Sequence, residues 1–138
     1  MTLADFVVKY LGKKVDYDNA YGAQCVDLFR QYCKDVIRCP HTGAVEGAKD
    51  LYFNFSLNDE KKYFDRKSAW FMAPGDVAIW DATSTNKYGH VAIVLMVDNK
   101  NKELLVLEQN GFAQDGCKIV KRNFENLLGV LRRKGETV

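Results

Sequence analysis

Apolar residues between positions 25 and 36 recur with the spacing of one helix face. They stand at positions 25, 28, 29, 32, 33 and 36, a spacing of three and four residues kept over three turns. The pattern predicts a helix from about Gln24 to Ile37. It ends near Cys39-Pro40, because proline disfavours helical geometry in the residue before it. A shorter amphipathic helix is predicted within residues 1–15 and a weaker helix with a loop within 43–57, whereas 58–67 form a charged, exposed stretch.

The pattern changes after Pro74-Gly75, where a tight turn is predicted. Short apolar segments separated by turn residues then predict strands at 76–80, 88–97, 103–109, 117–121 and 128–132. Helices come first and a strand meander follows, so the expected fold class is α+β, with N-terminal helices packed on a C-terminal antiparallel β-sheet. At 138 residues we expect a single domain over 1–138, ending in a basic tail at 132–138.

Composition and charge exclude several classes of protein. The formal net charge is +2 and the basic run Arg132-Arg133-Lys134 is short, so a nucleic-acid partner is not expected. The N-terminal segment lacks the apolar stretch and cleavage site of a signal peptide. No apolar run approaches the roughly 20 residues that cross a bilayer. We expect a monomer that does not insert into membranes and is not exported by a signal peptide.

The spacing of the four cysteines favours neither a disulfide pattern nor a zinc site. Cys25 and Cys33 lie on one predicted helix at about 12 Å, given a rise of ~1.5 Å per residue, which is too far for a disulfide. A zinc site of Cys33, Cys39, His41 and Cys117 is disfavoured because no CxxC pair is present. Buried free thiols are the better interpretation.

Cys25 stands at the start of the long predicted helix. Unpaired N–H groups and the helix dipole favour negative charge there, so a thiolate is stabilised. A cysteine on an apolar helix face is, however, also typical of a protein core. Its position alone does not decide between a nucleophile and a packed thiol.

A predicted hairpin offers a base and the groups that orient it. If its turn is centred on Lys100, His90 faces Asn110 and Ala92 faces Glu108, which places His90, Glu108 and Asn110 on one side of the sheet. A shift of one residue would send Glu108 and Asn110 to the other side.

Nucleophilic catalysis needs a base near the thiol and a third group that holds the base. Cys25, His90 and Glu108 or Asn110 supply these roles, and His90 is a better base than His41, which lies in a polar loop. The alternative is that His90 and the carboxamide at the strand end have surface roles.

The segment before Cys25 has the spacing of a calcium-binding loop. Positions 1, 3, 5, 7 and 12 of a twelve-residue window hold Asp16, Asp18, Ala20, Gly22 and Asp27, the ligand positions of an EF-hand. The match is partial, because Ala20 and Gly22 offer only carbonyl oxygens and Asp27 replaces the usual glutamate. An acidic surface loop is an equally good interpretation.

Four sequence motifs, taken together, resemble those of CHAP domains, especially the CHAP domains of bacteriophage endolysins. They follow one another in the family's order and cover nearly the whole chain: residues 21–28 (YGAQCVDL), 74–80 (PGDVAIW), 88–94 (YGHVAIV) and 106–110 (VLEQN).

The resemblance implies a papain-like α+β domain that hydrolyses peptidoglycan, as an N-acetylmuramoyl-L-alanine amidase or as an endopeptidase. It implies that Cys25 is the nucleophile, His90 the general base and Glu108 its orienting group. Asn110 is then a fourth member, and Gln24 helps to form the oxyanion hole. It also implies that the acidic loop binds a structural, activating Ca²⁺.

Family membership would place the enzyme in the cytoplasm of an infected host, from which it reaches the cell wall through a membrane lesion made by a partner. Endolysins often carry a separate wall-binding domain, which 138 residues do not accommodate. Two other functions stay open. One is a cysteine amidase that acts on a soluble amide such as a glutathione–polyamine conjugate. The other is a non-catalytic, calcium-dependent wall-binding module.

Overall fold

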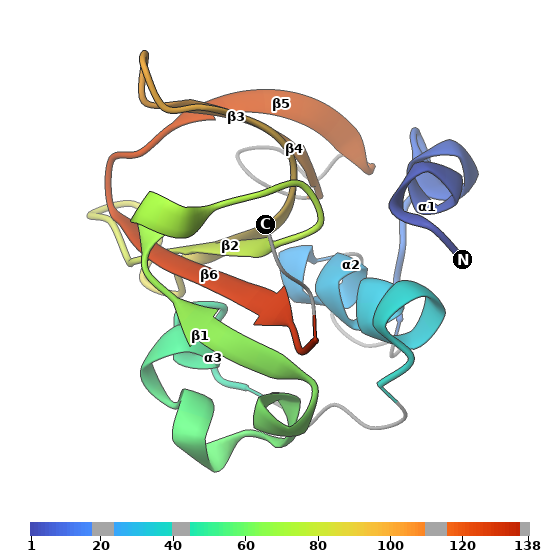
Figure 1. Cartoon of the computed structure of the whole chain (residues 1–138), viewed down its shortest axis with the longest axis horizontal. Helices are drawn as coiled ribbons and strands as arrows, with labels where there is room; N and C mark the ends of the chain where they lie inside the picture. Colours follow the sequence, from blue (N-terminus) through green and yellow to red (C-terminus); the bar gives the residue numbers. More distant parts are fainter. Residues whose placement is uncertain (18–23, 40–44, 110–115, 136–138) are drawn as a thin grey trace.

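Helices packed against an antiparallel sheet form the architecture of this computed structural model, which describes residues 1–17, 24–39, 45–109 and 116–135 (Figure 1). This confirms the predicted α+β class. The main helices are α1 (Leu3–Tyr10), α2 (Cys25–Tyr32) and α3 (Asp50–Phe53). The strands are β1 (Phe64–Lys67), β2 (Val77–Trp80), β3 (His90–Asp98), β4 (Glu103–Glu108), β5 (Lys118–Asn123) and β6 (Leu127–Arg133).

The six strands have the order β1-β6-β2-β3-β4-β5, and every neighbouring pair is antiparallel. Strands β2 to β5 form the predicted meander. The last strand instead returns across the sheet and lies between β1 and β2 (Figure 1). This insertion makes β2 a central strand, and all four of its residues are buried.

The helix predicted from Gln24 to Ile37 is present but changes its geometry halfway. α2 continues as a π-helix over Cys33–Ile37, and Arg38 ends it in the left-handed conformation with φ 67°. At the other end Gln24 is the N-cap residue, and its backbone N–H donates to Asp27 Oδ2 at 2.9 Å. The carboxylate thereby satisfies one of the N–H groups that helical bonds leave unpaired.

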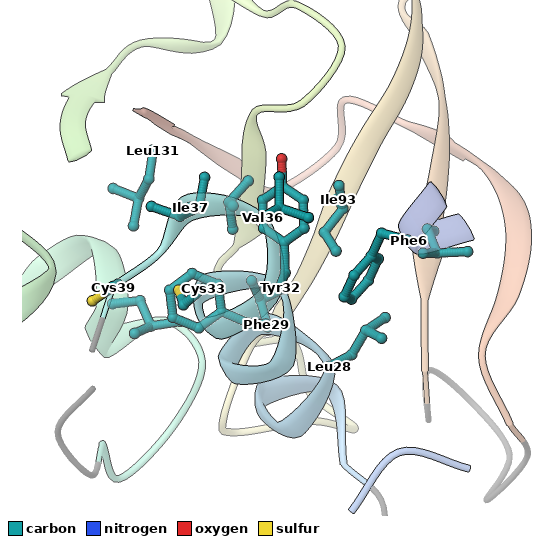
Figure 2. Close-up of a cluster of buried hydrophobic side chains, with 14 of the residues drawn as sticks. Phe6, Leu28, Phe29, Tyr32, Cys33, Val36, Ile37, Cys39, Ile93 and Leu131 are labelled. Atoms are coloured by element: carbon teal, nitrogen blue, oxygen red, sulfur yellow. The ribbon is translucent and has the colours of Figure 1, made fainter. Parts of the chain in front are cut away.

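The core lies between α1, α2 and one face of the sheet. In Figure 2, Leu28 and Tyr32 of α2 are directed toward Phe6 of α1 and Ile93 of β3, and all four side chains are buried. The Phe6 and Tyr32 rings meet edge-on with centroids 5.3 Å apart. Because this helix packs on the sheet along its length, the position of its first residue is fixed relative to the strand ends.

A second cluster covers the other face of the sheet. Alternate residues of β2 divide between the two clusters, with Val77 and Ile79 on the helix side and Ala78 and Trp80 on the opposite side, as the period of two along a strand requires. Both faces of the sheet are therefore packed.

The register of the β3–β4 hairpin is as predicted near the candidate site. Ile93 pairs with Leu107 and Val94 with Val106, which is the pairing that places His90 and Glu108 on one face. Beyond an irregularity at Leu95 the register shifts by one residue, so the predicted turn centred on Lys100 is wrong by half a residue. A β-bulge absorbs the offset before it reaches the site.

Two predictions about charged segments are wrong. The stretch 58–67 is not uniformly exposed, because it contains β1 and because Glu60 and Phe64 are buried. The basic tail does not begin at Arg132, which lies in β6, is buried and pairs with Asp76 through Nη2–Oδ2 at 2.7 Å and Nε–Oδ1 at 3.0 Å. A buried carboxylate is far less costly when it is paired in this way.

The four cysteines are free thiols. Among the described residues, no helix combines the length and apolar character needed to cross a membrane.

Candidate active site

Cys25 is the accessible thiol of the protein. It is the first residue of α2 and is partly exposed, whereas the other three cysteines are buried. Burial raises the pKa of Cys33 well above its ordinary value and that of Cys117 to about 12. Of the four thiols, Cys25 is therefore the one that can meet a substrate at neutral pH.

His90 lies against Cys25 at the start of β3. Its ring is buried, with 7% of the residue exposed, and the thiol of Cys25 is within hydrogen-bond reach. On the other side, Nε2 lies 3.2 Å from Glu108 Oε1. This is the distance of an ion pair, although the direction of the N–H bond does not meet the geometry of a hydrogen bond. The predicted meeting of positions 25, 90 and 108 is present in the structure.

These contacts change the protonation of His90. Burial lowers the pKa of His90, but the neighbouring Cys25 side chain and the negative charge of Glu108 raise it, and the pKa is about 9. The imidazole is then protonated at neutral pH and loses its proton as the pH rises through about 9.

Glu108 is held in place by Arg122, which was not among the predicted site residues. Arg122 Nη2 donates to Glu108 Oε2 at 2.8 Å, and its Nε donates to Oε1. Burial raises the pKa of Glu108, but the hydrogen bonds from Arg122 and the positive charges of Arg122 and His90 lower it to about 2. The carboxylate is thus an anion throughout the physiological pH range.

Trp80 packs beside the charged side chains of His90 and Arg122. It pairs with His90 across the β2–β3 ladder, and the ring centroids are 5.8 Å apart. The guanidinium of Arg122 lies 5.7 Å from the centroid of the Trp80 ring, which is a cation–π distance. One aromatic ring therefore contacts both His90 and the Arg122 guanidinium that binds Glu108.

A further buried polar residue lies next to Glu108. Gln109 is fully buried and hydrogen-bonds to the backbone of Val15 and Gln24. Gln109 and Arg122 stand at or just beyond the ends of predicted strands, and neither was predicted to be a site residue. Their partners are remote in the chain, so local patterns carry no signal for them.

The predicted oxyanion residue Gln24 is exposed at the N-cap of α2, directly before the thiol. Its role in the oxyanion hole stays a prediction. The predicted fourth member, Asn110, lies outside the described residues.

Of the predicted calcium ligands, Asp16 and Asp27 are described, whereas Asp18, Ala20 and Gly22 lie outside the described residues. Asp16 Oδ1 is buried and has no hydrogen-bond partner among the described residues. Asp27 is buried and uses Oδ2 to cap α2. No group of three or more His, Cys, Asp or Glu residues within the described ranges has the arrangement of a metal site.

Residues 14–110 match the family of CHAP domains. The chain belongs to the CHAP domain family. This CHAP domain is 33% identical over 97 residues to a D-alanyl-L-alanine endopeptidase of Streptococcus phage B30, a match that covers 67% of this chain and 21% of the relative. It is also 33% identical over 110 residues to the endolysin PlyTW of Staphylococcus phage Twort, with 73% of this chain and 22% of the relative covered. The matches span about a fifth of the length of these relatives.

Solved structures share the fold of this chain. The crystal structure of Ly7917 superposes with a TM-score of 0.74 at 21% identity, covering 96% of this CHAP domain and 62% of that chain. The endolysin LysIME-EF1 superposes with a TM-score of 0.66 at 22% identity, covering 96% and 64%. Helices packed on an antiparallel sheet are therefore the shared architecture.

The guanidinium of Arg122 is expected to control the protonation of Glu108. In Arg122→Met the carboxyl group of Glu108 stays buried but loses the two guanidinium N–H donors. The pKa of Glu108 should therefore rise from about 2 past the ordinary 4.5. Carboxyl ¹³C NMR across a pH titration measures this directly. Lys121→Met is the matched control, because Lys121 is an exposed residue of the same strand that pairs with Glu103. The control should leave the pKa of Glu108 at about 2.

Arg122→Met is also expected to lower the stability of the fold at neutral pH. In the wild type, the lowered pKa of Glu108 contributes stability that is present above pH 4.5 and is lost as the pH falls through about 2. Arg122→Met should lose this contribution at neutral pH. An unchanged carboxyl titration in Arg122→Met would show that the guanidinium does not set the charge of Glu108.

Proposed function

We propose that this CHAP domain hydrolyses an amide or peptide bond of bacterial peptidoglycan, with Cys25 as nucleophile and His90 as the proton-transfer group. The observation that carries the proposal is the contact between an accessible thiol and an imidazole that keeps its proton up to about pH 9. The curated relatives, an endopeptidase and an endolysin, support the choice of substrate.

The reaction begins when the Cys25 thiolate attacks the carbonyl carbon of the scissile bond. The tetrahedral oxyanion forms at the N-terminus of α2, where the backbone N–H of Cys25 and the side chain of Gln24 are the proposed donors. His90 gives its proton to the leaving amine nitrogen, the C–N bond breaks and a thioester remains. The neutral imidazole then takes a proton from water, the hydroxide displaces the thiolate, and His90 is again protonated.

Glu108 acts on the reaction through His90. The charge of its carboxylate, maintained by Arg122, stabilises the imidazolium and fixes the orientation of the ring. We propose that Asn110 assists this orientation, as the family resemblance implies. The bond cleaved is either the N-acetylmuramoyl-L-alanine amide or a peptide bond of the stem or cross-bridge, and the name of the phage B30 relative favours an endopeptidase.

Such an enzyme acts at the bacterial cell wall. We propose that it is made in the cytoplasm of an infected host, works as a monomer and reaches the wall after a partner has opened the membrane. Its direct partner is then the peptidoglycan itself.

Replacing the nucleophile is the test of this function. In Cys25→Ala the clearing of a suspension of purified cell walls should fall to the background rate, because covalent catalysis requires the sulfur. Cys117→Ala is the matched control, since it removes a buried thiol and should retain clearing. Mass spectrometry of the wild-type digest identifies the new amino termini, and so the bond that is cut.

Other outcomes of the same assay would contradict the proposal. Undiminished clearing by Cys25→Ala would remove the nucleophile from the reaction. Hydrolysis of a soluble amide without clearing of walls would indicate a soluble amidase. Wall binding by the wild type without any hydrolysis would indicate a non-catalytic module.

We further propose that the segment from Asp16 to Asp27 binds Ca²⁺ with a structural role. A buried carboxylate oxygen such as Asp16 Oδ1, which has no donor among the described residues, is the kind of atom that a cation satisfies. Asp27 fits less simply, because one of its oxygens already caps α2. A cation here would offset the carboxylate charge two residues from Cys25.

Chelation tests the calcium proposal through stability as well as activity. A ligand present at 100 times its dissociation constant stabilises a protein by about 2.7 kcal/mol, so adding EGTA should lower the melting temperature by several degrees and slow the clearing of walls. Excess Ca²⁺ should restore both, and Asp16→Asn should weaken the response to Ca²⁺. A melting temperature and a clearing rate that EGTA leaves unchanged would rule out a structural calcium.

A further inference from the structure

We propose that Gln109 is a positioning residue for the reaction, because its side chain fixes the peptide that carries Cys25 relative to the strand end that holds His90. The inference rests on the proposed function of Cys25 and His90 and adds a residue that does not touch the substrate. It is carried by three hydrogen bonds of one fully buried amide.

The amide of Gln109 has donors and acceptor matched to its partners. Oε1 accepts the N–H of Val15 at 2.7 Å, and Nε2 donates to the carbonyl oxygens of Val15 at 2.6 Å and of Gln24 at 2.9 Å. Turning the amide over would place its oxygen against two carbonyl oxygens and its NH₂ group against an N–H. One orientation is therefore strongly preferred, and the two backbone segments are held in one arrangement.

A hydrogen bond to the Gln24 carbonyl bears directly on the position of Cys25. It belongs to the peptide bond that joins Gln24 to Cys25, and it also accepts the N–H of Asp27 at 3.1 Å and of Leu28 at 3.4 Å. It is thus the first carbonyl of α2, and a displacement of it moves the nucleophile and the beginning of the helix together.

Glu108, the last residue of β4, and Gln109, which follows it, contact the two halves of the site. Glu108 contacts His90, and Gln109 contacts the peptide before Cys25. Successive side chains of a strand point to opposite faces, which allows one short piece of backbone to reach both. β4 is paired with β3 as far as Leu107 and with β5 as far as Glu108, so the backbone that leads into Gln109 is held in place. The relative position of sulfur and imidazole is therefore set by two adjacent residues.

A purely structural role would make a different prediction. If Gln109 only satisfied buried backbone groups, its loss would lower stability and leave the site of the folded fraction unchanged. If it positions Cys25, its loss separates the thiol from the imidazole, because contact between reacting groups is sensitive to displacements of about 1 Å. The protonation of His90 reports this separation, since hydrogen bonding to Cys25 contributes to its raised pKa.

The experiment compares Gln109→Met with Gln31→Met. Methionine has a similar length and lacks the amide. Gln31 is a control on α2, where its side chain donates to Asp35 at 3.1 Å. In Gln109→Met, kcat for wall fragments should fall roughly 10- to 100-fold with a smaller change in KM. The pKa of His90, followed by NMR of its ring protons, should fall from about 9 toward 6.5. Gln31→Met should keep both values.

The results that would overturn the inference are equally definite. A folded Gln109→Met with a lowered melting temperature but wild-type kcat and His90 pKa would show that the residue only stabilises the fold. If Gln109→Met does not fold, Gln109→Asn replaces it, because the shorter side chain keeps an amide but does not span all three contacts. Wild-type kcat and His90 pKa in Gln109→Asn would likewise overturn the inference.

Cys25→Ala separates this failure from that of the proposed function. Clearing of walls by Cys25→Ala contradicts the function and the inference together. An inactive Cys25→Ala beside a fully active Gln109→Met contradicts the inference alone.

Discussion

The contact on which the site depends is the buried carboxylate of Glu108 between a guanidinium and an imidazole. Burying an unpaired carboxylate costs on the order of several kcal/mol, and such a group would take up a proton instead. Arg122 prevents this, because it donates to both oxygens. The anion then retains the proton of His90, and the imidazolium stands beside Cys25.

The fold brings these groups together through packing and strand register. α2 is packed on the sheet by its apolar face, which fixes the position of Cys25 at its first turn. The β3–β4 pairing places His90 and Glu108 on one face, and β5 adds Arg122 on the same side. Tertiary structure therefore assembles four side chains from four elements, and each element contributes one.

Much of this was predictable from local patterns. The helix that begins at Cys25 follows from its 3.6-residue period, and the placement of His90 and Glu108 on one face of the sheet follows from alternation and turn chemistry. The bulge at Leu95 was not predictable, yet it left the register correct at the site. The edge strand Phe64–Lys67 was missed because it is short and mostly charged, as edge strands often are.

The remaining features depend on contacts remote in the sequence. Arg122 reaches Glu108 because β5 pairs with β4, and Gln109 reaches Val15 across 94 residues. The insertion of β6 between β1 and β2 likewise has no local signature. Motif resemblance led to the proposal that Cys25 is the nucleophile and His90 the base, whereas the residues that contact them became visible only in the folded chain.

The central claim is that His90 carries two ring protons in the resting enzyme while it contacts Cys25. A ¹⁵N NMR spectrum of the wild-type protein at pH 7.5, with the two histidines distinguished by a His41→Gln variant, tests it directly. The account predicts that both ring nitrogens of His90 have the chemical shifts of an imidazolium, because its pKa is about 9. A spectrum of a neutral imidazole, with one nitrogen unprotonated, would contradict it.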